Sequence, residues 1–309
     1  MKRDDTLWKA ILEDVFDDFL NFFYADAQNI FDFNKSFEFL DKELDDLFPK
    51  EESESIKYVD KLVKVYLIDG EERWILVHVE VQGYKDPKFE ERMFTYYYRI
   101  RDRYQKEITA WAILTDDSKK YKPNQYTATF LGTELHYKFN TYKVLEQNEE
   151  SLMKSDNIFA SIILTVLINL KSKANEDRNL IQLNLDIVRN LFKKGFPKEK
   201  VRSLMNFLRY YVRLDATNSR IFEQEIENIT GKTTTMGIEQ FLLERATKQG
   251  VEQGINIGIE KGIEKGIEKY QIEIILSLFE DSFDVLRIAK ITKLSLNQVE
   301  KILLDHNKI

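Results

Sequence analysis

The chain of 309 residues contains no cysteine and only three histidines, His78, His136 and His306. The absence of cysteine excludes a disulfide-stapled scaffold, a cysteine-ligated zinc site and a cysteine nucleophile. The three histidines leave little room for a histidine-based metal site or for Ser-His-Asp chemistry. These two shortages narrow the classes of enzyme to which the chain can belong.

Long apolar runs and an excess of basic charge are also missing. The longest apolar run, IFASIILTVLINL, has about 13 residues, which is too short to cross a bilayer. The N-terminal MKRDDTLWKAILEDVFDDFL is acidic and amphipathic, unlike a signal peptide. We therefore expect a cytoplasmic protein without a membrane segment. The net charge of −7 argues against a bulk electrostatic grip on nucleic acid, so any such grip must come from local patches.

What is present is enough apolar material for a core, with 43% hydrophobic and 13% aromatic residues. Strand and helix patterns follow one another along the chain. They predict a helix at 6–24, a second short helix at 36–49, a hairpin at 56–83, a helix at 87–104, a strand at 107–117, one or two strands at 126–145 and helices at 151–229. This order predicts an α/β core with a mixed sheet, followed by an all-helical C-terminal region.

The hairpin ends in VHVEVQG, where strand alternation gives Glu80 and Gln82 one face and the valines the other. If the valine face is shared across the hairpin, Asp60 lies close to directly opposite Glu80 on a solvent-directed face. Two facing carboxylates repel unless a cation lies between them, and Mg²⁺ is the usual cation for oxygen ligands. Two alternatives stay open. The acids are solvated on an exposed face, or Lys61 or Lys64 neutralises them.

Asp60, followed by Glu80-Val81-Gln82 on the next strand, resembles the core of the PD-(D/E)xK nucleases. The longer string VHVEVQGYKDPKFEERMFTYYYRIRDRY, followed by AWAILTDD, is similar to the family of bacterial recombination-promoting nucleases and putative transposases. The resemblance covers residues 1–150 and continues into the glycine repeats near the C-terminus. It implies a restriction-endonuclease-like core and a DNA endonuclease that hydrolyses phosphodiester bonds with Mg²⁺ or Mn²⁺.

Carried over to this chain, the resemblance makes Asp60 and Glu80 metal ligands, assisted by the backbone carbonyl of Val81. Gln82 stands where the motif has a lysine; it can hydrogen-bond a water but brings no positive charge. This departure and the acidic net charge favour a second interpretation, a catalytically weak or inactive DNA-binding or oligomerising protein on a nuclease fold. An upstream acid, Glu43 in FLDKELDDLF, is a further candidate ligand, or else an exposed helix acid. We expect His78 to be a tucked or partly exposed strand histidine rather than a ligand.

The helix at 87–104 carries Arg92, Tyr96, Arg99 and Arg103 on one stripe. Three arginines with a tyrosine among them suit contacts to DNA phosphates beside a metal site. The alternative is a surface helix whose arginines pair with nearby acids. A second stripe should be core: Met93, Tyr97, Ile100 and Tyr104.

Glycine recurs every fourth residue in GVEQGINIGIEKGIEKGIEKY, at Gly250, Gly254, Gly258, Gly262 and Gly266. Each glycine in a helix costs about 1 kcal/mol relative to alanine, so the repeat calls for a compensating contact. Close approach of a second helix would supply it and predicts a homodimer. The alternative is a flexible repeat that arose by slippage in the coding DNA.

The last segment, VLRIAKITKLSLNQVEKILL, resembles a helix-turn-helix, which serves either DNA binding or packing. Together these patterns divide the chain into a nuclease core at 1–150, a helical region packing on it at 151–230, a glycine-repeat helix at 231–270 and a helix-turn-helix-like segment at 271–309.

Overall fold

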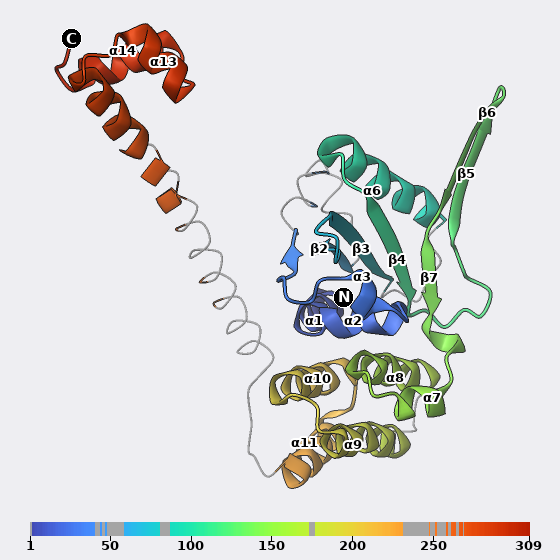
Figure 1. Ribbon diagram of the computed structural model, residues 1–309. Helices are drawn as coiled ribbons and strands as arrows, with labels where there is room; N and C mark the ends of the chain where they lie inside the picture. The colour runs from blue at the N-terminus through green and yellow to red at the C-terminus, as the bar shows by residue number, and fades with distance from the viewer. Residues whose placement is uncertain are drawn as a thin grey trace. The chain divides into compact units, whose positions relative to one another are not determined.

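The computed structural model describes residues 2–40, 44, 47, 59–80, 87–172, 177–230, 247, 251, 258, 261–263, 266–267 and 269–309. The chain folds as two compact units, Met1–Thr234 and Thr235–Ile309. The first unit contains both the sheet and the helices that follow it (Figure 1).

A five-stranded mixed sheet forms the centre of the first unit. Its spatial order is β1 (Glu38–Phe39), β2 (Val59–Tyr66), β3 (Glu72–Glu80), β4 (Ile108–Leu114) and β7 (Asn140–Lys143). β2 is antiparallel to both of its neighbours, β1 and β3, whereas β3, β4 and β7 run parallel to one another. The prediction of an α/β fold with a mixed sheet is therefore confirmed.

The β2–β3 hairpin is closed by the five residues 67–71, including the predicted Asp69-Gly70 pair. Gly70 has φ +88°, a left-handed conformation that glycine adopts without strain. The Asp69 carboxylate accepts a hydrogen bond from the Glu71 N–H at 2.9 Å, which fixes the loop. An odd number of loop residues keeps the apolar positions of the two strands on one face, as the sequence pattern required.

Helices cover both faces of the sheet (Figure 1). One face packs against the N-terminal helices α1 (Lys2–Asp14) and α2 (Phe16–Phe23), with the short α3 (Ala27–Ile30) beside them. The other packs against α6 (Phe89–Tyr104), which connects β3 to β4. Leu76 and Met93 are fully buried in that second layer, and each such side chain contributes about 1.5–3 kcal/mol.

The segment 126–145 was expected to contain one or two strands. The structure has three strands there, of which the first begins one residue earlier. Besides β7 it contains β6 (Thr133–Lys138) and most of β5 (Gln125–Phe130), and these two strands pair only with each other in the described part of the chain. Figure 1 shows them as a ribbon that projects away from the five-stranded sheet. We call β5 and β6 together the ribbon.

The helices after β7 form the rest of the first unit. They follow the short η1 (Val144–Glu146) and are α7 (Glu149–Lys154), α8 (Ile158–Lys171), α9 (Asp177–Lys194), α10 (Lys198–Tyr211) and α11 (Ala216–Thr230). The longest apolar run of the sequence is α8, whose residues 158–168 are all buried among its neighbours. Among the described residues, no helix combines the length and apolar character needed to cross a membrane.

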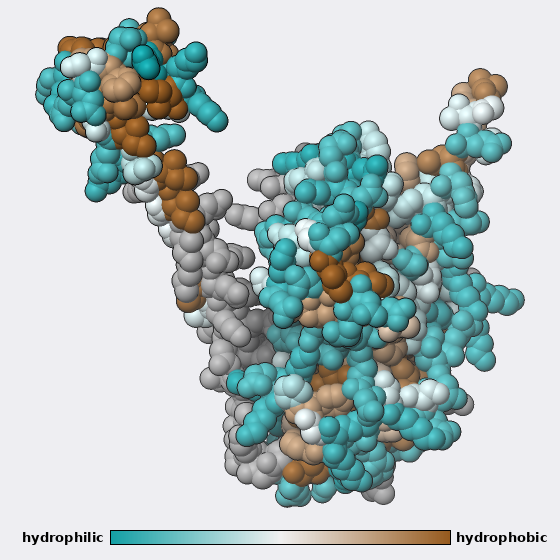
Figure 2. Space-filling view, in the orientation of Figure 1, coloured by the Kyte–Doolittle hydropathy of each residue, from teal (hydrophilic) through white to brown (hydrophobic). Residues whose placement is uncertain are grey.

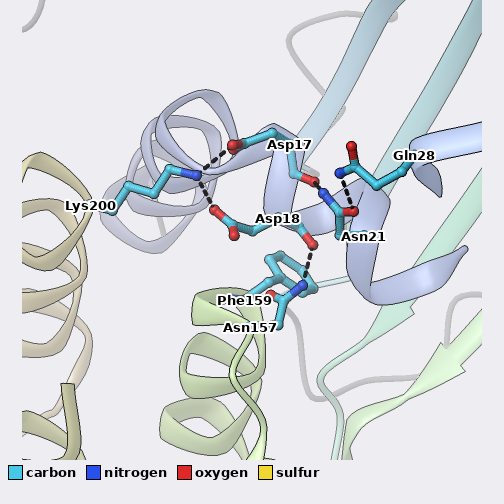
Figure 3. Close-up of polar contacts among 7 residues, drawn as sticks. All are labelled: Asp17, Asp18, Asn21, Gln28, Asn157, Phe159 and Lys200. Atoms are coloured by element: carbon cyan, nitrogen blue, oxygen red, sulfur yellow. Dashed lines mark hydrogen bonds and ion pairs between the residues drawn. The ribbon is translucent and has the colours of Figure 1, made fainter. Parts of the chain in front are cut away.

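A polar network joins these helices to the N-terminal ones (Figure 3). Lys200 of α10 forms ion pairs with both Asp17 and Asp18 of α2. Asn157, the N-cap of α8, donates its side-chain amide to the Asp18 carbonyl at 2.8 Å. Burial raises the pKa of the Asp18 carboxyl, and Lys200 opposes that effect.

The second unit contains a helix at 269–280, then α13 (Val285–Thr292) and α14 (Leu296–Asp305). Lys293, at φ +58°, ends α13, and Ser295 starts α14 with a capping box formed with Gln298. The buried core of the second unit consists of Ile275, Ile288, Ala289, Val299 and Leu303. The helix-turn-helix pattern thus builds a small three-helix core.

Candidate functional site

The predicted metal ligands lie at one end of the five-stranded sheet. Asp60 is the second residue of β2 and Glu80 is the last of β3, and because these strands are antiparallel both positions fall at the same end. Leu114, the last residue of β4, pairs with Glu80, and Lys143, the last of β7, pairs with Leu114. The carboxyl ends of three parallel strands therefore meet where β2 begins.

The expected pairing of the two acids is wrong by two residues. Asp60 is the cross-strand partner of His78, not of Glu80. Glu80 lies two residues further along β3, diagonal to Asp60. Alternation still assigns positions 60, 78 and 80 to one face of the sheet, so the acids stay neighbours although they do not oppose each other.

The expectation that this face is directed to solvent is also wrong, because α6 covers it. His78 is fully buried, and its ring contacts Phe89 edge-on at 5.0 Å. Leu62 and Leu76, on the same face, are fully buried too. Of the two environments that the sequence left open for His78, tucked or partly exposed, the structure shows the first.

Several predicted site residues fall outside the part of the chain that the structure describes. These are Glu43, Val81 and Gln82, together with the side chains of Asp60 and Glu80. The residues that are described contain no group of three or more acids and histidines able to hold a metal. Two carboxylates on adjacent strands are nevertheless a hard-oxygen donor set, which fits Mg²⁺ or Mn²⁺ by its chemistry.

The two lysines considered as neutralising partners have other contacts. Lys61 belongs to the valine face, pairs with Val77, and forms an ion pair with Glu13 of α1. Its side chain is 1% exposed. Lys64 pairs with Glu38 at the sheet edge. Each lysine thus has at least one ion pair with an acid other than Asp60 and Glu80.

Sequence reasoning missed a buried ion pair at this end of the sheet. Lys143 pairs with the Asp116 carboxylate, and the two side chains are 3% and 2% exposed. The Lys143 ammonium also donates to the Asp116 carbonyl at 3.2 Å. The pair joins the end of β7 to the loop after β4. Its only signal was the TDD that directly follows a buried strand.

The arginine stripe on α6 is only partly at the surface. Tyr96 is 2% exposed and belongs to the core, so it is withdrawn from the predicted DNA contacts. Arg92 stacks on Phe89 with 5.3 Å between the guanidinium and the ring centroid. Arg99 is half-buried and donates to a backbone carbonyl at 3.2 Å, whereas Arg103 is exposed.

Comparison with models of known families, with curated proteins and with solved structures finds no match to this chain.

Proposed function

We propose that the protein is a metal-dependent endonuclease that hydrolyses phosphodiester bonds in DNA. The observation that carries the proposal is the placement of Asp60 and Glu80 as diagonal neighbours on adjacent strands at one end of the sheet. The connection through α6 to the parallel strand β4 adds support, because it gathers the strand ends beside the acids. Brought to one place, two carboxylates suit a divalent cation.

In this proposal Asp60, Glu80 and the backbone carbonyl of Val81 hold Mg²⁺ or Mn²⁺. When bound, such an ion lowers the pKa of a coordinated water and offsets charge on the scissile phosphate. Gln82 hydrogen-bonds and orients the attacking water through its side-chain amide. Arg103 and Arg99 contact flanking phosphates and fix the position of the DNA strand.

Plasmid nicking by the purified protein, with Mg²⁺ and with EDTA, tests the activity. Asp60→Asn and Glu80→Gln keep side-chain shape, which is needed because α6 covers the face to which positions 60 and 80 belong. Each should remove Mg²⁺-dependent nicking and weaken Mn²⁺ binding measured by calorimetry. Glu150→Gln, at an exposed position on α7, is the matched control. Nicking by either site variant at the wild-type rate would overturn the proposal.

A second candidate is a DNA-binding protein without catalysis, favoured by Gln82 at the position of the motif's lysine. In that case wild type binds DNA without nicking it. The variant Gln82→Lys restores the missing cation and separates the catalytic function from the non-catalytic one. Nicking that arises only in this variant would assign the wild-type chain to the binding class.

A further inference from the structure

The ribbon has one polar face and one apolar face. Cross-strand pairing and alternation place Tyr126, Ala128 and Phe130 of β5 on the same face as Leu135 and Tyr137 of β6. The opposite face carries Thr127, Thr129, Glu134 and His136. Two-stranded ribbons are marginally stable alone, and further strands at an edge or packing of the apolar face supply the missing stability.

Among the residues that the structure describes, the aromatic contacts to the apolar face lie at the base of the ribbon. Tyr126 stacks on Phe94 of α6 at 5.3 Å, and Phe94 stacks on Tyr98 at 6.3 Å. Tyr98 is itself 56% exposed. We call Phe94, Tyr98 and Tyr126 the aromatic base. Beyond it the ribbon continues into solvent.

The far end of the ribbon is apolar and strained. Phe130 is 75% and Leu131 89% exposed, and Figure 2 shows hydrophobic atoms at the end of the projecting ribbon. Leu131 and Gly132 form a two-residue turn with φ of +45° and +83°. Asparagine is the favoured residue at the first position of such a turn, since leucine is disfavoured at positive φ. Leu131 therefore adds backbone strain and apolar exposure together, with nothing in the described chain to offset them.

The charge on the ribbon points to a protein partner. The ribbon carries one carboxylate, Glu134, and one basic side chain, Lys138, which lies at its base opposite Gln125. Binding to DNA or to an anionic membrane draws on several basic side chains, and the ribbon has none between its base and its far end. Natural sheet edges are usually blocked by lysine, proline or inward charge, and β5 has none of these between Tyr126 and Phe130.

We infer that the ribbon pairs with the ribbon of a second copy of this chain, β5 against β5 about a two-fold axis at Ala128. Antiparallel pairing centred there sets Phe130 opposite Tyr126 of the second copy. Phe130, at the tip of each ribbon, then lies beside the aromatic base of the other copy. The positions match because Phe130 and Tyr126 are equally distant from Ala128 along the strand. The arrangement is closed, since each copy gives one tip and receives one.

The backbone of β5 suits this register. Phe130 and Thr133 close the two-residue turn, so the ladder alternation directs the N–H and C=O groups of Phe130, Ala128 and Tyr126 toward β6. The groups of Thr127 and Thr129 then point outward and meet Thr129 and Thr127 of the second copy. The two Ala128 residues form a pair without hydrogen bonds, in which Cα atoms are about 4.5 Å apart. The carboxylates of Glu134 from the two copies fall on different rows and do not oppose each other.

The first test is the mass of the full-length protein by sedimentation over a concentration series. Such a small interface predicts a dissociation constant in the micromolar range. The double variant Phe130→Thr with Leu131→Asn keeps strand propensity and gives an Asn-Gly turn, so the ribbon should still fold. The dissociation constant of the dimer should rise about tenfold or more. Ile68→Thr, a turn residue 59% exposed, is the matched control and should leave the mass unchanged. A monomeric wild type, or a double variant that dissociates like wild type, would refute the pairing.

The second test uses the absence of cysteine. Ala128→Cys introduces a single thiol, and mild oxidation should link two chains, because the expected Cα separation lies within disulfide range. Glu150→Cys, on exposed α7, should stay unlinked under the same conditions. Absence of a linked product would contradict the register. Binding of a DNA duplex is measured alongside, and loss of DNA binding by the tip variant at unchanged mass would assign the ribbon to DNA instead.

Discussion

Lys143 is a charged side chain that the fold has taken almost completely out of water, with Asp116 as its counter-charge. Lys143→Met removes the cation and leaves a buried carboxylate, which should lower the free energy of unfolding by about 3–5 kcal/mol. Adding Asp116→Leu should recover most of that loss, because no charge then stays buried. Urea unfolding measures all of these values. Lys122→Met, which breaks an exposed pair with Glu146, should change stability by under about 1 kcal/mol. A single Lys143 variant as stable as wild type would show that the pair is not coupled to folding.

Individual residues were predictable only where local pattern decides their environment. His78 was expected to be tucked or partly exposed, and its full burial follows from the packing of α6 on its face of the sheet, which the strand pattern could not show. Lys61 shows the limit, because a lysine between strand residues normally indicates exposure. Its partner Glu13 is 48 positions away along the chain, and only the packing of α1 on β2 brings the two together.

At the scale of elements, periodicity predicted most strands and helices, and each exception has its own physical cause. A shift of the β2–β3 pairing by two residues leaves every side chain on its own face, so the apolar pattern alone cannot choose between Glu80 and His78 as the partner of Asp60. Apolar and polar residues alternate through the whole segment 126–145, so the pattern does not indicate where β6 ends and β7 begins. Tyr96 lies with Met93 and Ile100 on the side of α6 that meets the sheet, whereas the sequence pattern had assigned it to the arginine stripe.

The arginines of α6 make a prediction about DNA binding. Arg103→Ala should reduce the dependence of log affinity on log salt by about 0.9, as expected for one lost phosphate contact. Arg99→Ala should have a smaller effect on that slope, since this guanidinium already donates to the Leu47 carbonyl. Fluorescence anisotropy with a labelled duplex at several salt concentrations measures the slopes, with Lys154→Ala on α7 as the control. Identical slopes for Arg103→Ala and wild type would remove α6 from the DNA-binding surface.

The contact between α2 and α10 makes a prediction about pH. Burial alone would lower the pKa of Lys200, but its hydrogen bonds with Asp17 and Asp18 raise the pKa above its ordinary value. A raised lysine pKa means that its stabilising contribution is complete below the unfolded-state pKa and is lost as pH rises through the folded-state pKa. Lys200→Met should therefore lower the free energy of unfolding at neutral pH by about 1–2 kcal/mol, and the difference from wild type should narrow above about pH 10.

Denaturant unfolding at a series of pH values measures this difference. Lys198→Met is the control, because it changes an exposed lysine at the start of the same helix. The two acids that Lys200 joins are about 180 positions away from it in the chain, so the pair could not be read from local patterns. A difference that stays constant into the alkaline range would mean that Lys200 acts through its hydrocarbon stem rather than its charge.

At the scale of the whole molecule, the chain carries two separate features that suit association with further copies. One is the ribbon in the first unit and the other is the glycine repeat in the second. Two independent two-fold contacts on one chain generate a closed assembly such as a tetramer, or an open filament, depending on the angle between the two axes. The mass of the wild-type protein at rising concentration therefore reports whether one or both are used.

The glycine repeat makes the last prediction. A Cβ added at Gly258, Gly262 or Gly266 would meet no atom within 4 Å, so in the described part of the chain these positions are open to a partner. If a second helix packs there, Gly258→Leu with Gly262→Leu should block its approach and lower the mass measured by light scattering, although leucine raises intrinsic helicity. Lys261→Leu with Lys269→Leu adds the same leucines away from the glycine positions and should leave the mass unchanged. Combining the glycine pair with the ribbon variant Phe130→Thr and Leu131→Asn should give a monomer if both contacts operate. If the glycine pair keeps the wild-type mass, and the combination has the same mass as the ribbon variant alone, the repeat does not hold copies together, and the flexible-repeat interpretation replaces it.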